Sequence, residues 1–159
     1  LDKCVDLLLT YDDAHTSIAQ VLLDQRVFCG VGNVYRSEVL WACELSPFAR
    51  VGELGEPVAR RLVNVAAQLL RANLVRADRV TVPGVPGGLA VYGRTSQACH
   101  RCHDSIHAVE HGNPPRCLYW CPGCQTRHAP RSDRDDTPTD QHPAARFFLA
   151  ERDLARSLR

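Results

Sequence analysis

The spacing of apolar side chains predicts that the first half of the chain is helical. Apolar residues recur at helical spacing after capping candidates over residues 12–29, and again over residues 34–46. Gly30-Val31-Gly32 separates these two helices and predicts a sharp turn, because glycine adopts backbone conformations that other residues avoid. Asn33 follows as the N-cap of the second helix, and a third apolar stripe covers residues 57–75, with proline in its first turn.

The pattern changes after the third helix. Residues 80–82 and 89–92 are predicted to be extended, on either side of a loop rich in proline and glycine. Residues 127–140 are polar and charged, which predicts disorder, and residues 143–158 could form a terminal helix. No element is predicted for residues 1–14. These changes of composition predict a helical module, a connecting segment with a cysteine-rich module, and a tail, over residues 1–79, 80–126 and 127–159.

The overall charge does not by itself indicate a nucleic-acid-binding protein. The formal net charge is only +1, so any basic surface has to be local. Hydrophobic residues make up 45% of the chain, which is enough for a folded core. No apolar stretch approaches the length of a membrane span, and no signal peptide is visible. We therefore expect a folded protein without membrane association.

Two Cys-x-x-Cys pairs give the strongest chemical signal. Cys99 and Cys102 form one pair, and Cys121 and Cys124 form the other after an interval of 18 residues. This spacing is typical of four-thiolate zinc sites, and the interval is long enough for a β-hairpin that brings the two turns together. A closed shell of four thiolates leaves no position for water or substrate, so the zinc would be structural. Its binding would supply folding free energy to a small hairpin.

Other interpretations of the eight cysteines remain open. An even number of cysteines in an exported protein could form a disulfide framework, and four thiolates could also hold an iron–sulfur cluster. Cys117 lacks a partner at Cys-x-x-Cys spacing and is interpreted as an ordinary hairpin residue. Because no export signal is present, a reducing compartment is favoured.

The glycine turn before Asn33 has two interpretations. A glycine-rich turn at a helix start exposes backbone N–H groups, and the helix dipole adds partial positive charge, which together outline a phosphate site. The alternative is a plain turn between two helices, capped by Asn33.

Two stretches resemble one family of DNA-repair enzymes. Leu22-Leu23-Asp24-Gln25, Gly30-Val31-Gly32-Asn33-Val34-Tyr35 and Glu38 resemble the helix–two-turn–helix element of bacterial formamidopyrimidine-DNA glycosylase and endonuclease VIII. Tyr92-Gly93-Arg94, the four paired cysteines and Cys124-Gln125 resemble the zinc finger of the same family. Order and spacing agree over about residues 15–126, and endonuclease VIII-like proteins are the nearest match.

The resemblance implies a mostly α fold, in which a helix–two-turn–helix module precedes a small β-hairpin zinc finger. Cys99, Cys102, Cys121 and Cys124 would hold one structural zinc ion. The implied function is the DNA-binding part of a base-excision-repair DNA glycosylase and AP lyase that acts on oxidised bases. Its partner would be double-stranded DNA that is damaged or contains abasic sites. The resemblance further implies a monomer in the bacterial cytoplasm, associated with the nucleoid.

Three DNA contacts follow from the same resemblance. Asn33 matches the family's asparagine that binds phosphates flanking the extruded nucleotide. Arg116, five residues before the third cysteine of the finger, matches the hairpin arginine, and Tyr92 matches the tyrosine of the Tyr-Gly-Arg motif. Contacts of this kind position the duplex while a base is turned out of the stack, and they do not read the base sequence.

One part of the family pattern is not found in this sequence. In the family, an N-terminal proline followed by glutamate, on a β-rich lobe, attacks the abasic sugar and forms an imine. This chain begins with Leu1-Asp2-Lys3, so we expect it to lack the catalytic lobe and to bind abasic DNA without excising bases or nicking the strand. The rival hypotheses are a zinc-ribbon adaptor that binds protein, and a stand-alone DNA-binding protein without a catalytic lobe.

Overall fold

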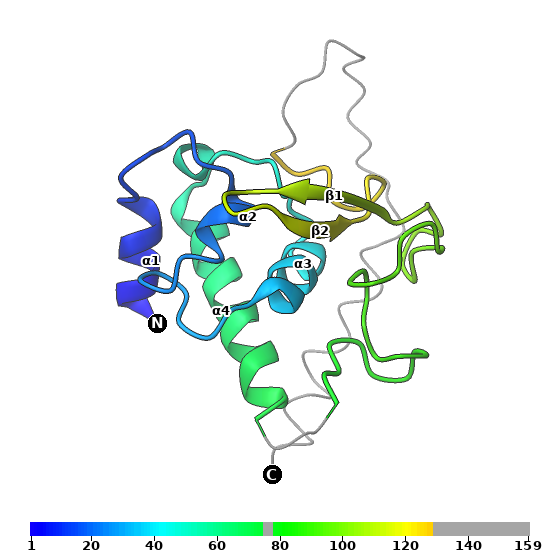
Figure 1. Cartoon of the computed structure of the whole chain (residues 1–159). Helices are drawn as coiled ribbons and strands as arrows, with labels where there is room; N and C mark the ends of the chain where they lie inside the picture. The colour runs from blue at the N-terminus through cyan, green and yellow to red at the C-terminus, as the bar shows by residue number, and fades with distance from the viewer. Residues whose placement is uncertain (75–77, 129–159) are drawn as a thin grey trace.

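The fold combines short helices with one β-hairpin (Figure 1). The computed structural model describes residues 1–74 and 78–128. The predicted disorder over residues 127–140 and the predicted helix over residues 143–158 fall outside these ranges, except for residues 127 and 128. Among the described residues, no helix combines the length and the apolar character that a membrane span requires. The elements, in chain order, are α1 (Asp2–Leu9), α2 (Ile18–Val21), α3 (Asn33–Ala42), η1 (Val51–Glu53), α4 (Glu56–Ala72), β1 (His107–His111) and β2 (Arg116–Trp120).

Helix α4 confirms the third predicted helix and organises the helical module. Pro57 and the acidic Glu56 lie in its first turn and Arg71 lies in its last, as the helix dipole favours. Both α1 and α3 pack against it. Helix α1 lies in a region for which no element was predicted. It buries Val5 and Leu8, which are three residues apart and so share one face of the helix. The stripe that α4 buries consists of Ala59, Leu62, Val63 and Ala66.

The helix predicted over residues 12–29 is wrong in length, because only α2 is helical there. Asp24 gives a physical reason. Its Oδ1 accepts the backbone N–H of Arg26 at 3.0 Å and also the Nε of the same arginine at 3.0 Å. Such a local bond from side chain to backbone offers the chain an alternative to helix, so the chain turns instead.

Gln25 then shapes the glycine turn. Its Oε1 accepts the backbone N–H of Gly30 at 3.0 Å, while its Nε2 donates to the carbonyl of Val31 at 2.9 Å. Gly30 has a φ of 89°, in the left-handed region that favours glycine. One glutamine side chain thus fixes both sides of the turn that leads into α3.

Helix α3 begins at the residue that was predicted to cap it. Gly32 is the N-cap and Asn33 is the first helical residue, so the prediction of an Asn33 cap is wrong. The side-chain amide of Asn33 instead donates to the carbonyl of Cys117 at 2.9 Å. A tertiary contact has taken the side chain away from the local role that its residue type favours.

Neither segment that was predicted to be extended forms a strand in the described part of the chain. The backbone N–H groups of Thr81 and Val82 both donate to the carbonyl of Gly88, at 2.8 and 3.0 Å, and so close a loop. Residues 90–92 use their N–H groups on a side chain of α3 rather than on another strand.

The hairpin between the two cysteine pairs is confirmed. Strands β1 and β2 pair antiparallel, with His107 opposite Trp120 and His111 opposite Arg116. Leu118 of β2 is fully buried in the same core as the helices, and β2 packs against α3 (Figure 1). A second, smaller core gathers around Ile106 and the paired cysteines. The predicted combination of a helical module with a β-hairpin is therefore confirmed, and the hairpin is docked on the helices.

Candidate functional site

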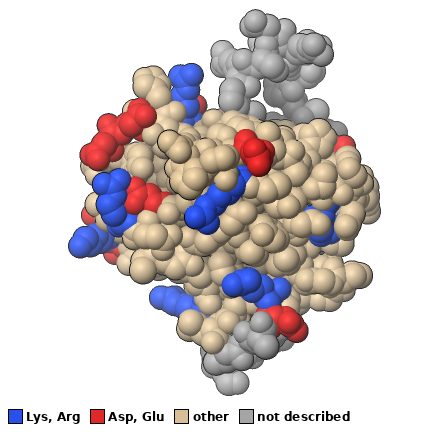
Figure 2. Space-filling view, viewed as in Figure 1, with Lys and Arg blue, Asp and Glu red and all other residues tan. Residues whose placement is uncertain are grey.

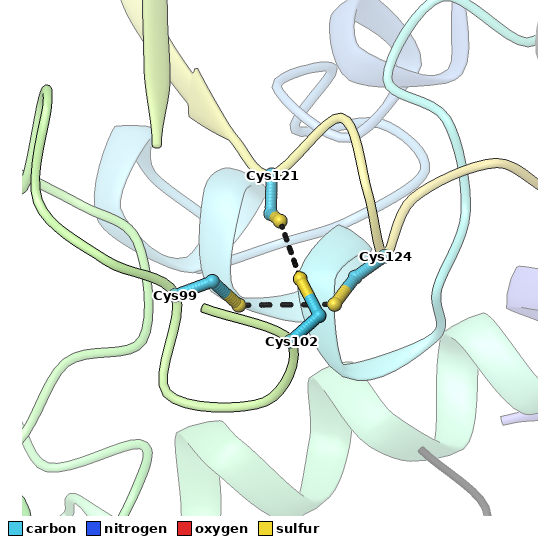
Figure 3. A group of neighbouring side chains, drawn as sticks. All are labelled: Cys99, Cys102, Cys121 and Cys124. Carbon is cyan, nitrogen blue, oxygen red and sulfur yellow. Dashed lines mark hydrogen bonds between the residues drawn. The ribbon is translucent and has the colours of Figure 1, made fainter. Parts of the chain in front are cut away.

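The four paired cysteines converge on one point (Figure 3). Their Sγ atoms all lie within 4.8 Å of one another. Cys99 Sγ lies 3.7 Å from Cys124 Sγ, and Cys102 Sγ lies 3.4 Å from Cys121 Sγ. Four sulfurs at about 2.3 Å from a tetrahedral zinc ion are spaced about 3.8 Å apart, so donor set and spacing both fit this metal. Cys117 lies outside the cluster.

The cysteine cluster is closed and tightly built. Cys99 and Cys121 are fully buried, and hydrogen bonds from Cys121 and Cys124 hold the pKa of Cys99 below its usual range. A Cβ at Gly123 would lie 3.2 Å from Cys102 Sγ and 2.8 Å from Asp104 Oδ2, so a side chain there would crowd the cluster. A buried site of this kind has no opening for a substrate, which is the character of a structural metal site.

The buried side-chain amide of Gln125 connects the second cysteine pair to the helical module. Its Oε1 accepts the backbone N–H of Cys121 at 2.8 Å, and its Nε2 donates to the carbonyl of Leu45 at 3.1 Å. The side chain thereby joins the cysteine cluster to the chain that follows α3.

One face of α3 meets the hairpin. Asn33, Ser37 and Trp41 are spaced four residues apart and share a stripe of the helix. Asn33 donates to the carbonyl of Cys117, and the Oγ of Ser37 accepts the backbone N–H of Tyr119 at 3.3 Å. The glycine turn and the start of β2, which are far apart in sequence, therefore lie together.

Arg36 is the residue of this region that sequence reasoning missed. Its side chain is fully buried, and its Nη2 donates to the carbonyls of Arg116 at 3.2 Å and Cys117 at 3.1 Å. Its Nε and Nη1, like the Oδ1 of Asn33, find no hydrogen-bond partner among the described residues. Burial, and then the nearby Arg116, lowers the pKa of Arg36 to about 10. Nothing in the sequence distinguishes Arg36 from a surface arginine of a helix, because its burial comes from the packing of β2 on α3.

Arg116 lies at the open end of this arrangement. It is the first residue of β2, its side chain is exposed, and its own carbonyl accepts a bond from Arg36. The structure therefore brings the predicted Asn33 and Arg116 to the same junction between the glycine turn and the hairpin.

Tyr92 is placed by a buried carboxylate. Glu38, which is 1% exposed, accepts the backbone N–H groups of Ala90 at 2.7 Å, Val91 at 2.9 Å and Tyr92 at 2.8 Å. The hydroxyl of Thr81 donates to the same carboxylate. The backbone N–H groups of Ala90 and Val91, both fully buried, would be unpaired without Glu38, which gives this acidic residue a structural role.

Two adjoining hollows connect Tyr92 with Asn33. The larger, about 540 Å³, is bordered by Tyr92, and the smaller, about 160 Å³, is bordered by Asn33. Both hollows share Val34 and Arg79 in their walls. On its other side, the ring of Tyr92 lies 5.0 Å from the ring of Tyr119 on β2. The three residues that are predicted to contact DNA thus lie in or beside the first half of α3 and the strand β2.

On one face of the molecule, the charge is local rather than general. Figure 2 shows this face, on which Lys and Arg side chains stand in small separate groups, several of them beside Asp or Glu. Among the described residues, Arg60 pairs with Asp2 and Glu56, and Arg26 pairs with Asp24. On the face shown, an anionic partner would therefore be attracted by particular arginines and not by a broad basic field.

Comparison with known proteins gives matches to formamidopyrimidine-DNA glycosylases and endonuclease VIII proteins. The family model described as the formamidopyrimidine-DNA glycosylase H2TH domain matches residues 4–83, which is half of the chain. The DNA-(apurinic or apyrimidinic site) lyase Nei2 of Mycolicibacterium smegmatis is 42% identical over 116 residues, which are 72% of this chain and 44% of that protein. The formamidopyrimidine-DNA glycosylase of Corynebacterium aurimucosum is 38% identical over 122 residues, which are 70% of this chain and 43% of that protein.

The fold agrees with solved structures of the same family. Lactococcus lactis formamidopyrimidine-DNA glycosylase, non-covalently bound to DNA containing an AP site, matches with a TM-score of 0.64 and 26% identity. The match covers 79% of this chain and 45% of that one, so the chain spans less than half the length of its relatives. From the family match over the glycine turn, the sequence identity and the shared fold, we conclude that the chain belongs to the formamidopyrimidine-DNA glycosylase and endonuclease VIII family of DNA-repair proteins.

Proposed function

We propose that this chain is the DNA-binding part of a base-excision-repair DNA glycosylase and AP lyase that acts on oxidised bases. One observation carries the proposal. At the junction of the glycine turn and the hairpin, Asn33 and the fully buried Arg36 both donate to the carbonyl of Cys117, and Arg36 also donates to that of Arg116. These bonds fix the backbone of Arg116, whose side chain is exposed, beside the start of a helix, where an anionic oxygen is favoured.

A DNA phosphate fits this junction. Asn33 begins a helix directly after a glycine turn, where backbone N–H groups and the helix dipole favour an anion. Arg116 adds an exposed guanidinium beside it. Contacts of this type fix the position of a duplex without reading its bases, so Asn33 and Arg116 would hold the backbone next to a damaged or abasic site, and the buried Arg36 would hold the start of β2 in place.

Tyr92 and the metal complete the proposed interface. Tyr92, at the edge of the larger hollow, would contact the DNA backbone from the other side of α3. Cys99, Cys102, Cys121 and Cys124 would hold a structural zinc ion, which would keep Arg116 on a rigid hairpin. We infer further that the protein binds DNA as a monomer in the bacterial cytoplasm, at the nucleoid.

Measurement of DNA affinity tests the proposal. Fluorescence anisotropy with a duplex that carries an abasic-site analogue should show that Asn33→Ala and Arg116→Ala each weaken binding about tenfold, the usual effect of losing one charge-assisted contact. The matched control is Arg60→Ala, which removes an exposed arginine that pairs with Asp2 and Glu56 on the helical module. Unchanged affinity in the double variant Asn33→Ala with Arg116→Ala would favour the rival hypothesis of a protein-binding zinc-ribbon adaptor.

A further inference from the structure

A tryptophan of the helical module reaches one sulfur of the cysteine cluster. The Nε1 of Trp41, on α3, donates to Cys99 Sγ at 3.4 Å, although the two residues are 58 positions apart. The indole N–H can only donate, so the sulfur is the acceptor. Cys99 also accepts the backbone N–H of Arg101 at 3.4 Å, a local bond within its own turn. The bond from Trp41 is different because it comes from another module.

Arg101 holds the indole ring in this position. Its guanidinium carbon lies 3.8 Å from the centre of the Trp41 ring, and its Nη1 donates to the carbonyl of Trp41 at 3.1 Å. The Arg101 side chain is only 5% exposed and lies 3.7 Å from Glu44, which in turn lies 3.3 Å from Arg127. A stacked guanidinium with a fixed hydrogen bond restricts both the tilt and the position of the ring.

We propose that Trp41 is a positioning residue for the metal, which slows the loss of zinc by stabilising the thiolate of Cys99. The inference rests on the proposed zinc site. Four thiolates around a divalent cation leave net negative charge inside a small buried core, and an N–H donor aimed at one sulfur disperses part of it. Outer partners of metal ligands typically change metal affinity by about 10–100-fold when they are removed. Among the four clustered sulfurs, all of which lie in the described part of the chain, only Cys99 Sγ accepts a hydrogen bond from a helix.

Substitution of Trp41 by phenylalanine tests this role. Trp41→Phe keeps an aromatic ring under Arg101 but removes the N–H donor, whereas Trp120→Phe changes the other of the chain's two tryptophans, which packs against Phe48 and His107. We expect zinc to pass from Trp41→Phe to a colorimetric chelator about tenfold faster than from the unchanged protein, and from Trp120→Phe at an almost unchanged rate. In the cobalt-substituted protein, the thiolate-to-cobalt charge-transfer band should shift in Trp41→Phe and stay in place in Trp120→Phe.

A measurement on the unchanged protein covers the case in which Trp41→Phe does not fold. After exchange of the metal for an NMR-active cadmium isotope, the Trp41 indole proton should show coupling to cadmium through the hydrogen bond and Cys99, and the Trp120 indole proton should not. Absence of zinc from the unchanged protein would overturn the proposed metal site itself. Bound zinc with equal release rates for both variants, or an uncoupled Trp41 proton, would overturn only the role of Trp41.

Discussion

The carboxylate of Glu38 accepts the backbone N–H of Tyr92 across 2.8 Å, although 54 positions of sequence separate them. Together with the bonds to Ala90 and Val91, this contact ties the segment that enters the cysteine module to the middle of α3. The relationship makes Glu38 the link between the two sequence motifs of the chain.

Glu38→Gln should therefore destabilise the protein strongly. An amide keeps one acceptor oxygen but places N–H donors against buried backbone N–H groups, so we expect the free energy of unfolding to fall by about 3 kcal/mol. Urea denaturation followed by circular dichroism measures the change. The control is Glu56→Gln, which removes an exposed carboxylate paired with Arg60. Equal stability of the two variants would contradict a structural role for Glu38.

Metal analysis should find one zinc ion per chain. We expect that Cys99→Ser combined with Cys121→Ser abolishes zinc binding, while Cys117→Ser leaves it unchanged, because Cys117 lies outside the sulfur cluster. Chelation should unfold the hairpin and leave most of the helical signal in the circular dichroism spectrum. Full zinc content in the double variant would show that other residues hold the metal.

Arg36→Met should weaken DNA binding while leaving the stability of the protein nearly unchanged. Burial lowers the pKa of Arg36, so its charge is unfavourable in the fold, and methionine fills a similar volume without charge. Because Arg36 holds the carbonyls of Arg116 and Cys117 in place, we expect DNA affinity to fall about tenfold while the free energy of unfolding changes by less than about 1 kcal/mol. Anisotropy and urea denaturation on the same preparation test both parts. A large loss of stability with unchanged affinity would mean that Arg36 serves the fold alone.

His111 should make the protein less stable in mild acid. Its Nε2 lies 2.7 Å from Ser17 Oγ and its ring lies 5.5 Å from that of Phe48. Burial, and then the charge of Arg36, lowers the pKa of His111 below its ordinary value near 6.5. The histidine therefore binds a proton more readily in the unfolded chain. The contribution of neutral His111 to the free energy of unfolding is complete above the pKa that this histidine has in the unfolded chain, and it is lost as the pH falls below that value.

Comparison of two histidine variants checks this pH dependence. Between about pH 7.5 and about pH 5.5, with zinc present throughout, we expect His111→Gln to lose less stability than the unchanged protein. His15→Gln, which changes an exposed histidine, should follow the unchanged protein. If all three proteins lose stability with the same slope, His111 does not titrate in this range.

Salt dependence should reveal how many phosphates are bound. The proposed contacts are ionic, so DNA affinity should fall linearly with salt on a double logarithmic plot. Arg116→Ala should lower the slope by about one, because one phosphate contact is removed. A slope that Arg116→Ala leaves unchanged would place this side chain away from the DNA.

The elements that depend on residues close together in the chain could be predicted from the sequence. The cluster of four cysteines follows from spacing within two turns, and α4 follows from a regular stripe that begins after Pro57. The hairpin follows from the need to bring Cys102 and Cys121 together. Each cysteine pair and α4 depend on residues that are neighbours in the chain or share one turn, and the hairpin depends on two pairs separated by only 18 residues.

The parts that could not be predicted depend on distant partners. Asparagine is a common helix cap, but the side-chain amide of Asn33 donates to the carbonyl of Cys117 in the hairpin instead. Residues 89–92 have the composition of a strand, but their N–H groups bond to Glu38. Arg36 and Trp41 look like ordinary residues of a helix until the hairpin is placed against them. The roles of Asn33, Tyr92 and Arg116 in DNA binding, and the domain boundaries, stay predictions.

Helix α3 restricts how this family member could change in length. Consecutive residues of a helix are rotated by about 100°, so a single inserted residue after Asn33 would turn Glu38 and Trp41 away from their partners together. The loop over residues 83–88 and the turn between β1 and β2 carry no such constraint. Viable insertions and deletions should therefore accumulate in these two loops, while the interval from Asn33 to Trp41 keeps a constant number of residues.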